Sequence, residues 1–217
     1  MKNLKFNFIV GLFLVIILNV SIYAAGSQLW VSQNVVFNTT NNVKFVLFNQ
    51  SRTDLDDKKQ VVYYVDPTIL YKINDQFSFG IAHRIVFTPE YDYYAPHLNL
   101  IYTYKVNDNI KISYRNRVYF EVKNKYNVID RNKLTLKYVY NQFSPFIAGE
   151  IYSIYLNNSD LREEFKQYEL SVGSSYKITN NSTLVLYYLH KATKNDDDDD
   201  EYSRVNVIGT TLNLTIK

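Results

Sequence analysis

The stretch Ile110–Glu121, IKISYRNRVYFE, decides the fold class, because its side chains separate into two opposed sets with a period of two residues. One set is mainly apolar: Ile110, Ile112, Tyr114, Asn116, Val118 and Phe120. The other carries four charges: Lys111, Ser113, Arg115, Arg117, Tyr119 and Glu121. Successive strand residues point to opposite sides of a sheet, whereas a helix would mix the two sets around its circumference. The stretch is therefore predicted to be a strand with one charged face.

The same alternation recurs along the chain and predicts eleven strands. They are expected at residues 28–38, 43–52, 60–72, 76–88, 97–106, 110–122, 129–140, 145–156, 164–178, 183–191 and 202–216. Most of these segments have ten or more residues, which is longer than the usual strand of a soluble sandwich and suits a tilted strand that crosses a membrane. In such a barrel the apolar face meets lipid and the charged face lines a wet lumen.

The predicted connections differ in size between the two ends of the strands. Short connections rich in Asn are expected at residues 39–42, 73–75, 107–109, 141–144 and 179–182. Longer and mostly charged loops are expected at residues 53–59, 89–96, 123–128, 157–163 and 192–201. Short turns at one end and longer loops at the other are typical of outer-membrane barrels. The predicted fold is all-β: a single antiparallel up-and-down transmembrane β-barrel of about 10–12 strands.

Three features of the pattern do not fit a regular antiparallel barrel. Eleven strands cannot close a wholly antiparallel cylinder, so we expect ten, with 28–38 outside it, or twelve, with one strand hidden in a connection; twelve is favoured. Pro67 cannot donate to a strand ladder and predicts a bulge. The segments 28–38, 43–52 and 183–191 carry apolar residues on both faces, which predicts a plugged interior or a periplasmic surface.

The first 24 residues have the pattern of a secretory signal. Lys2 and Lys5 precede an apolar run at residues 6–20, and the small residues Ala24 and Ala25 follow. The run is shorter than the ~20 apolar residues of a membrane-spanning helix. We therefore expect a signal peptide at residues 1–24, cleavage after Ala24, a barrel domain at residues 25–217, and export to the cell outer membrane.

Composition restricts the partners. Without Lys2 and Lys5, 22 basic residues face 21 acidic ones, and the chain has no basic block that would follow nucleic-acid phosphates. The chain has no cysteine, which excludes disulfides and thiolate metal sites. The acidic run Asp196–Asp200 lacks the glycine and alternating spacing of a calcium loop, which favours a solvated loop tip. We expect no nucleic acid, no cofactor and no metal.

The expected partners are outer-membrane lipids, lipopolysaccharide and the barrel assembly machinery, and the ligand is unknown.

Charged residues of neighbouring strands form the best candidate site, a lumen charge network made of Arg115, Arg117, Glu121, Arg131, Lys133, Glu150 and Glu169. A hairpin across residues 123–128 would bring Glu121 near Arg131 and Arg115 near Lys137, and the next hairpin would bring Glu150 near Lys133 or Thr135. Paired charges would plug and stiffen a barrel, because an unpaired charge within a membrane is costly. An open path lined by these residues would instead prefer anions.

Four short motifs in this region carry a resemblance. They are Trp30, the pair of basic residues in Arg115-Asn116-Arg117 with Glu121 after it, Arg131-Asn132-Lys133, and Ala148-Gly149-Glu150-Ile151-Tyr152. In these motifs the chain resembles a family of small Gram-negative outer-membrane barrels known only as a domain of unknown function, over about residues 28–217. The resemblance implies an outer-membrane location and no known activity.

Several functions follow from these patterns. The first is a structural or surface-binding barrel with a charge-plugged lumen, and the main alternative is a small anion-preferring porin. For surface binding, the tyrosine-rich predicted loop at 89–96 offers Tyr91, Tyr93 and Tyr94. A membrane lipid hydrolase would need a serine and a carboxylate at one histidine, and no local motif shows that arrangement, so we expect no enzyme. A soluble lipid-binding barrel would require apolar residues inside and polar residues outside, the inverse of every face assigned above.

Overall fold

The computed structural model describes residues 26–122, 126–156, 162–194 and 202–216. The predicted signal peptide at 1–24 and the acidic run Asp196–Asp200 lie outside the described residues. The described chain forms eleven strands: β1 (Gly26–Asn38), β2 (Val43–Asp54), β3 (Lys59–Lys72), β4 (Phe77–Phe87), β5 (Asp92–Lys105), β6 (Ile110–Val122), β7 (Tyr126–Tyr138), β8 (Phe143–Leu156), β9 (Arg162–Lys177), β10 (Ser182–Lys194) and β11 (Tyr202–Ile216). Every predicted strand segment overlaps one of them. Within these residues, no helix is long and apolar enough to span a membrane.

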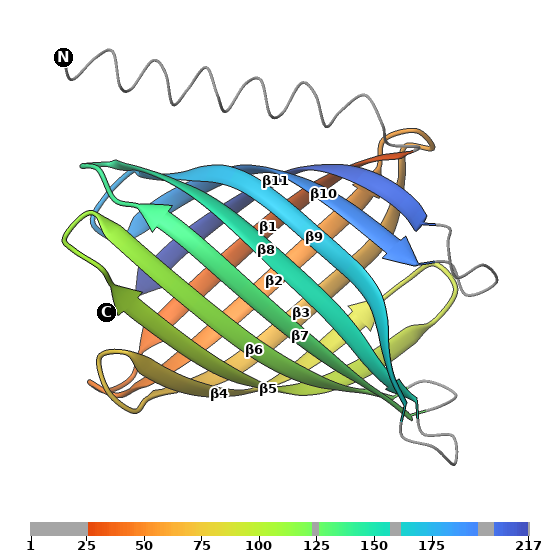
Figure 1. Cartoon of the computed structure of the whole chain (residues 1–217), viewed down its shortest axis with the longest axis horizontal. Helices are drawn as coiled ribbons and strands as arrows, with labels where there is room; N and C mark the ends of the chain where they lie inside the picture. Colours follow the sequence, from red (N-terminus) through yellow and green to blue (C-terminus); the bar gives the residue numbers. More distant parts are fainter. Residues whose placement is uncertain (1–25, 123–125, 157–161, 195–201, 217) are drawn as a thin grey trace.

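The strands form one closed barrel, in which each strand from β1 to β10 pairs with the next along the chain in the antiparallel sense. The strands lie tilted side by side around the wall (Figure 1). The prediction of an all-β fold with a single barrel is confirmed. The length of the strands follows from uninterrupted alternation, because each residue added to a strand keeps its side chain on the correct face.

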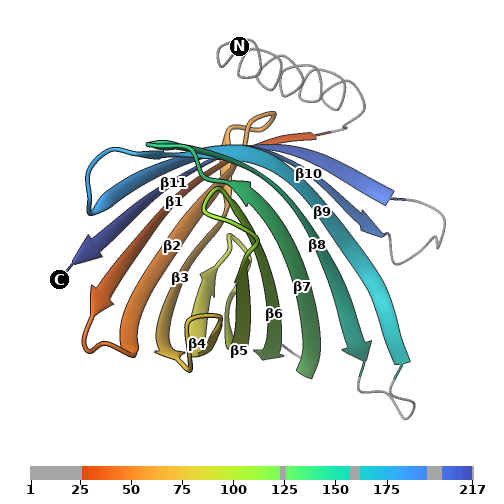
Figure 2. The same cartoon turned by 60° about the vertical axis from the view of Figure 1, so that its left-hand side comes forward.

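The barrel closes with eleven strands, so the expectation of ten or twelve is wrong. β1 and β11 run in the same direction and pair in parallel through twelve residue pairs, from Gly26–Val205 to Phe37–Ile216. Figure 2 shows these two strands side by side on one wall. An odd strand count leaves the first and last strands pointing the same way, and parallel strands still satisfy their backbone groups. The cylinder is therefore mixed, not wholly antiparallel.

Apolar side chains pack inside the barrel along this seam. Trp30 of β1, Leu189 of β10 and Val207 of β11 form a buried cluster, with Tyr187 and Val205 packed against it. Apolar residues of β1, β2 and β10, such as Trp30, Phe48 and Leu189, thus face the lumen. For these segments the prediction had left open a plugged interior or a periplasmic surface. The burial of the cluster compensates for a parallel ladder that is slightly weaker per residue.

Proline interrupts two ladders without a bulge, so the bulge predicted at Pro67 is wrong. Asp66 and Pro67 have no partner in β4, but the register is the same on both sides of the gap. Pro96 leaves a similar gap between β5 and β6. Because proline has no N–H, the ladder loses hydrogen bonds around it, but neither strand gains an extra residue. The bulges lie elsewhere, at Arg52/Thr53 and Tyr152/Ser153.

Asparagine builds two of the tight turns at one end of the barrel. The side-chain oxygen of Asn74 accepts hydrogen bonds from the backbone N–H groups of Gln76 and Phe77, and Asn107 does the same for Asn109 and Ile110. Such turns are intrinsic to Asn, which explains why the sequence revealed them.

The predicted difference in loop size between the two ends is largely wrong where the structure describes it. The connections at 55–58 and 88–91 are no longer than the turns at 39–42 and 73–76. The strands extend further into the predicted loops, since Pro96 is accommodated within β5 and the strand begins at Asp92.

The two faces of the wall have opposite character. Large apolar side chains such as Ile81, Leu134 and Leu170 are more than half exposed on the outside, whereas Arg84 and Glu150 are buried inside. The other strongly exposed apolar residues of the strands include Ile69, Ile147, Leu186 and Ile208. The face assignments made from the alternation therefore hold. This arrangement is the inverse of a soluble barrel, in which apolar side chains fill the interior.

Candidate functional site

The site lies on the inner faces of β6, β7 and β8, but the register of the first hairpin differs from the prediction. Arg115 pairs with Lys133 and Arg117 with Arg131. The prediction placed Arg115 opposite Lys137. β7 begins at Tyr126, earlier than expected, and this moves the β7 partner of every β6 residue by four positions. In the second hairpin, Lys133 and Thr135 were the two partners predicted for Glu150, and Lys133 lies opposite it.

Glu150 is the anionic centre of the site. Its carboxylate is buried, with Arg115 Nη2 3.2 Å and Arg131 Nη2 3.0 Å from Oε1, and Lys133 Nζ 3.6 Å from Oε2. We call these four residues the Glu150 cluster. Three cations share a single carboxylate, so the cluster keeps a positive excess.

A second buried ion pair joins β3 and β4. Arg84 donates to Oδ2 of Asp66 through Nη2 at 2.7 Å and Nε at 3.1 Å. The ring of His97 is 1% exposed, and its Nε2 lies 3.5 Å from the other oxygen of Asp66. No sequence motif marked this group, since Asp66 precedes the proline that was expected to disrupt its strand.

Arginine and aromatic side chains alternate across the lumen. This arginine–aromatic belt consists of Trp30, Arg52, Tyr64, Arg84, Tyr119, Arg131, Tyr152 and Glu169. Each guanidinium lies between two rings, with 3.9–5.5 Å from its central carbon to the ring centres. The Tyr152 hydroxyl then donates to Glu169 at 2.9 Å. Cation–π contacts strengthen when desolvated, so the belt is a cohesive layer.

Only one feature of the sequence indicated this belt. Tyr119 stood on the charged face of the opening stretch, which was the one visible signal. Tyrosine in membrane barrels is more often found at the membrane interface. The His97 ring, with its centre 4.4 Å from that of Tyr119, adds a side chain from β5 to the same layer.

The belt separates two cavities. The larger, of about 550 Å³, lies between the belt and the short-turn end, and its lining runs from Arg52 to Lys44 along β2. The smaller, of about 160 Å³, lies toward the other end and includes Tyr93, Glu121 and Lys191. The residues that line both cavities all belong to the belt: Arg52, Arg84, Arg131 and Glu169.

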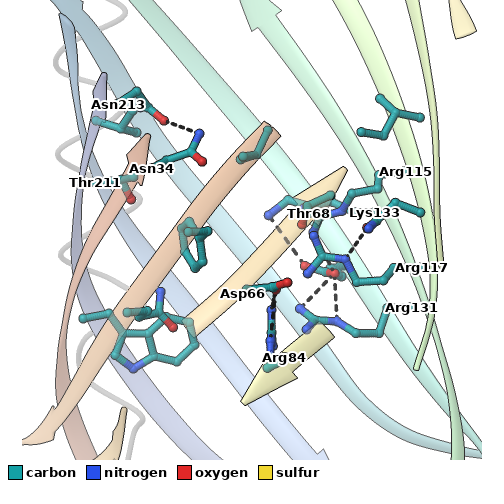
Figure 3. A pocket seen from close by; sticks show the side chains of 18 of the residues that line it. Asn34, Asp66, Thr68, Arg84, Arg115, Arg117, Arg131, Lys133, Thr211 and Asn213 are labelled. Atoms are coloured by element: carbon teal, nitrogen blue, oxygen red, sulfur yellow. Dashed lines mark hydrogen bonds and ion pairs between the residues drawn. The ribbon is translucent and has the colours of Figure 1, made fainter. Parts of the chain in front are cut away.

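Charge is unevenly distributed around the larger cavity. Among its described lining residues, seven are Lys or Arg and three are Asp or Glu. Arg115, Arg117, Arg131 and Lys133 point into it from β6 and β7, while Asn34 and Asn213 lie on the opposite side at the seam (Figure 3). Arg117 donates to the neutral oxygens of Asn99 and Tyr119, at 2.5 and 2.6 Å. The cavity is therefore suited to an anion.

The remaining predicted site residues lie in different places. Glu121 pairs with Asn127, four positions before Arg131 on β7, and lines the smaller cavity. Glu169 pairs with Glu150 across β8 and β9, and accepts hydrogen bonds from Tyr152 and Gln167. Glu169 thus joins the site as expected, whereas Glu121 lines the smaller cavity.

The candidate surface loop is shorter than predicted. Tyr91 lies in the connection between β4 and β5, but Tyr93 and Tyr94 are residues of β5 itself. Tyr93 points inward to the smaller cavity, whereas Tyr94 is 53% exposed on the outside. Alternation within a strand separates the two, so the three tyrosines do not form one exposed surface.

The histidines are directed at groups other than a nucleophile. His97 Nδ1 lies 3.2 Å from the Ala95 carbonyl oxygen, and its Nε2 faces Asp66. His190 Nδ1 lies 3.2 Å from Asn206 Oδ1, and His83 stacks on Tyr94. Within the described ranges, no three His, Cys, Asp or Glu side chains come together as metal ligands.

Comparison with known proteins identifies the family. The pattern of the family described as "Protein of unknown function (DUF2490)" matches residues 27–202, so the chain belongs to this family. The resemblance to a family of unknown function, seen in the motifs from Trp30 to Tyr152, is thereby confirmed. No curated protein matches the chain.

Proposed function

We propose that this member of the DUF2490 family is an outer-membrane barrel whose lumen is closed to solutes by the arginine–aromatic belt, with a structural or binding role and no catalysis. Its partners would be outer-membrane lipids, lipopolysaccharide and the assembly machinery. The signal pattern at residues 1–24 supports export by this route. The observation that carries the proposal is the inversion of the two faces, apolar outside and charged inside.

The apolar outer face of the barrel supports contact with lipid. Single exposed apolar residues are ordinary on soluble proteins, but here they recur on the outward face of strand after strand. A closed barrel also satisfies its backbone hydrogen bonds within itself, which lipid requires. A soluble lipid carrier would need the opposite arrangement of faces, so this alternative loses its support.

The inner face argues for closure. Asp66 and Glu150 hold basic partners at ion-pair distance, and the belt packs rings between the guanidinium groups. At the level of the belt, long side chains in contact leave little space for a hydrated ion. The belt thus supports a closed lumen more directly than the charges alone.

Two measurements test this function. Fractionation of the outer membrane with heat-modifiable gel mobility tests the location and the closure of the barrel. Recordings in planar bilayers test the lumen, and the mature protein should be nearly silent. Purification as a monomer without detergent would overturn the membrane assignment, and steady unitary conductance would overturn the closed lumen.

A small anion-preferring porin is the second candidate. It is favoured by the seven basic residues against three acidic ones around the larger cavity. If this function is correct, the wild type should conduct with a preference for anions. That preference should disappear when Arg115, Arg117 and Arg131 become Gln.

A further inference from the structure

We propose that the larger cavity binds an amphipathic anion, with an apolar body against β1, β2 and β10 and a carboxylate or phosphate head against β6 and β7. The proposal deepens the proposed function, since it assigns a ligand class to a lumen that the belt closes. It rests on the belt as the inner boundary of the cavity, and it holds or fails separately from the conductance of the barrel.

The first observation is a basic wall of the cavity, formed by Arg115, Arg117, Arg131 and Lys133. Arg115, Arg131 and Lys133 share one carboxylate, and Arg117 has only neutral acceptors among its hydrogen bonds to described residues. The Nε of Arg115 is buried and makes no hydrogen bond within the described part of the chain. A buried donor without an acceptor is costly, and an anionic head in front of this wall would satisfy it.

The second observation is the composition of the opposite wall of the cavity, which we call the apolar wall. β1, β2 and β10 contribute eleven of the described lining residues, of which seven are apolar or aromatic: Trp30, Val36, Val46, Phe48, Val185, Tyr187 and Leu189. The other four are Asn34, Lys44, Gln50 and Arg52. In the strand order of the barrel, β1 is five strands from β6 in one direction and six in the other. The apolar and basic walls therefore face each other across the lumen. A small inorganic anion would use only one of these walls.

The dimensions of the cavity are the third observation. Its volume of about 550 Å³ is within the range of ordinary ligand pockets, which are mainly apolar with a few convergent polar groups. The lining reaches Lys44 and Asn34 near the short turns, which gives a ligand an approach from that end. The belt closes the other side, so the cavity is a binding site and not a passage.

The single tryptophan provides the assay, because Trp30 is buried in the apolar wall. In nonionic detergent at pH 8, 11-bromoundecanoate should quench Trp30 fluorescence saturably, since bromine quenches at short range. The neutral 11-bromoundecanol is the matched probe and should give no saturable quenching. Competition with dodecanoate and with dodecyl phosphate then identifies the preferred head group.

Variants locate the head group. Arg117→Gln should weaken bromoundecanoate binding about tenfold, the effect of losing one charge-assisted hydrogen bond, and Arg117→Lys should retain most of it. Lys191→Gln, beyond the belt in the smaller cavity, is the control and should bind as the wild type does. Heat-modifiable mobility establishes that each variant is folded before it is assayed.

Three results would overturn the proposal. Equal saturable quenching by the bromo-alcohol would show an apolar pocket without anion recognition. Displacement of bromoundecanoate by millimolar inorganic phosphate would show a simple anion site. Absence of quenching in folded wild type would show that no ligand of this class reaches Trp30. None of these outcomes changes the expected conductance or membrane location.

Discussion

Two nitrogens of Arg131 approach the same oxygen of Glu150, with Nε 3.1 Å and Nη2 3.0 Å from Oε1. The same guanidinium carbon lies 4.1 Å from the centre of the Tyr152 ring. Arg131 thereby links the Glu150 cluster to the arginine–aromatic belt. One side chain therefore belongs to both the Glu150 cluster and the belt.

Glu150→Gln should destabilise the barrel strongly. Removing the carboxylate leaves three cations together without their shared partner, and breaking a buried pair typically costs about 3–5 kcal/mol. Unfolding in urea monitored by heat-modifiable mobility measures the loss. Glu121→Gln is the matched control, because Glu121 lines the smaller cavity, whereas Glu150 lines the larger one. Equal losses for the two variants would refute the central role of Glu150.

Leu136→Arg should impair assembly far more than Thr135→Arg. Leu136 is exposed on the outside of β7 and Thr135 lies on its inner face. Arginine at the bilayer midplane costs about 2–4 kcal/mol, whereas the lumen tolerates polar residues. Folding yields in lipid vesicles measure the difference. Similar yields would show that the outer face does not meet lipid.

Removal of residues 212–217 should abolish heat-modifiable mobility. This segment of β11 includes the residues that pair with Gln33–Phe37 of β1 and close the seam. An open edge would leave unpaired backbone groups in contact with lipid. A truncated chain that still migrates as the folded species would mean that the parallel pairing is not required for closure.

Tyr119→Ala should make the barrel conduct. Its ring lies between Arg84 and Arg131, and its hydroxyl accepts hydrogen bonds from Arg117 at 2.6 Å and Arg131 at 3.2 Å. Its loss breaks the middle of the belt and joins the two cavities. Planar-bilayer recordings provide the measurement, with the outward residue substituted in Tyr138→Ala as the control. Silence in a folded Tyr119→Ala barrel would show that other side chains close the lumen.

Gly209→Ala should destabilise the seam by about 1–3 kcal/mol, the usual cost of overpacking. The Tyr187 ring occupies the space where a Cβ at position 209 would lie. At Gly149 an added Cβ would meet Leu170 at an ordinary 3.6 Å, so Gly149→Ala is the control. The difference between their urea midpoints measures the effect, and a neutral Gly209→Ala would contradict the close packing of Tyr187.

The sequence by itself determined the strands and their faces. Alternation in Ile110–Glu121 marked which side chains point inward, because a shift of one residue would move every side chain to the wrong face. It also placed Arg115, Arg131 and Glu150 together on the lumen side. The tight turns were visible because asparagine forms them locally.

The register and the closure were decided only by the tertiary structure. A shift of four residues between β6 and β7 leaves every side chain on its own face, so a period of two cannot reveal whether Arg115 meets Lys137 or Lys133. Likewise, no local pattern in β1 or β11 states that the two strands pair in parallel. That pairing depends on the ring of strands as a whole. Contacts across the lumen, such as Arg84 between Tyr64 and Tyr119, exist only once the ring is closed.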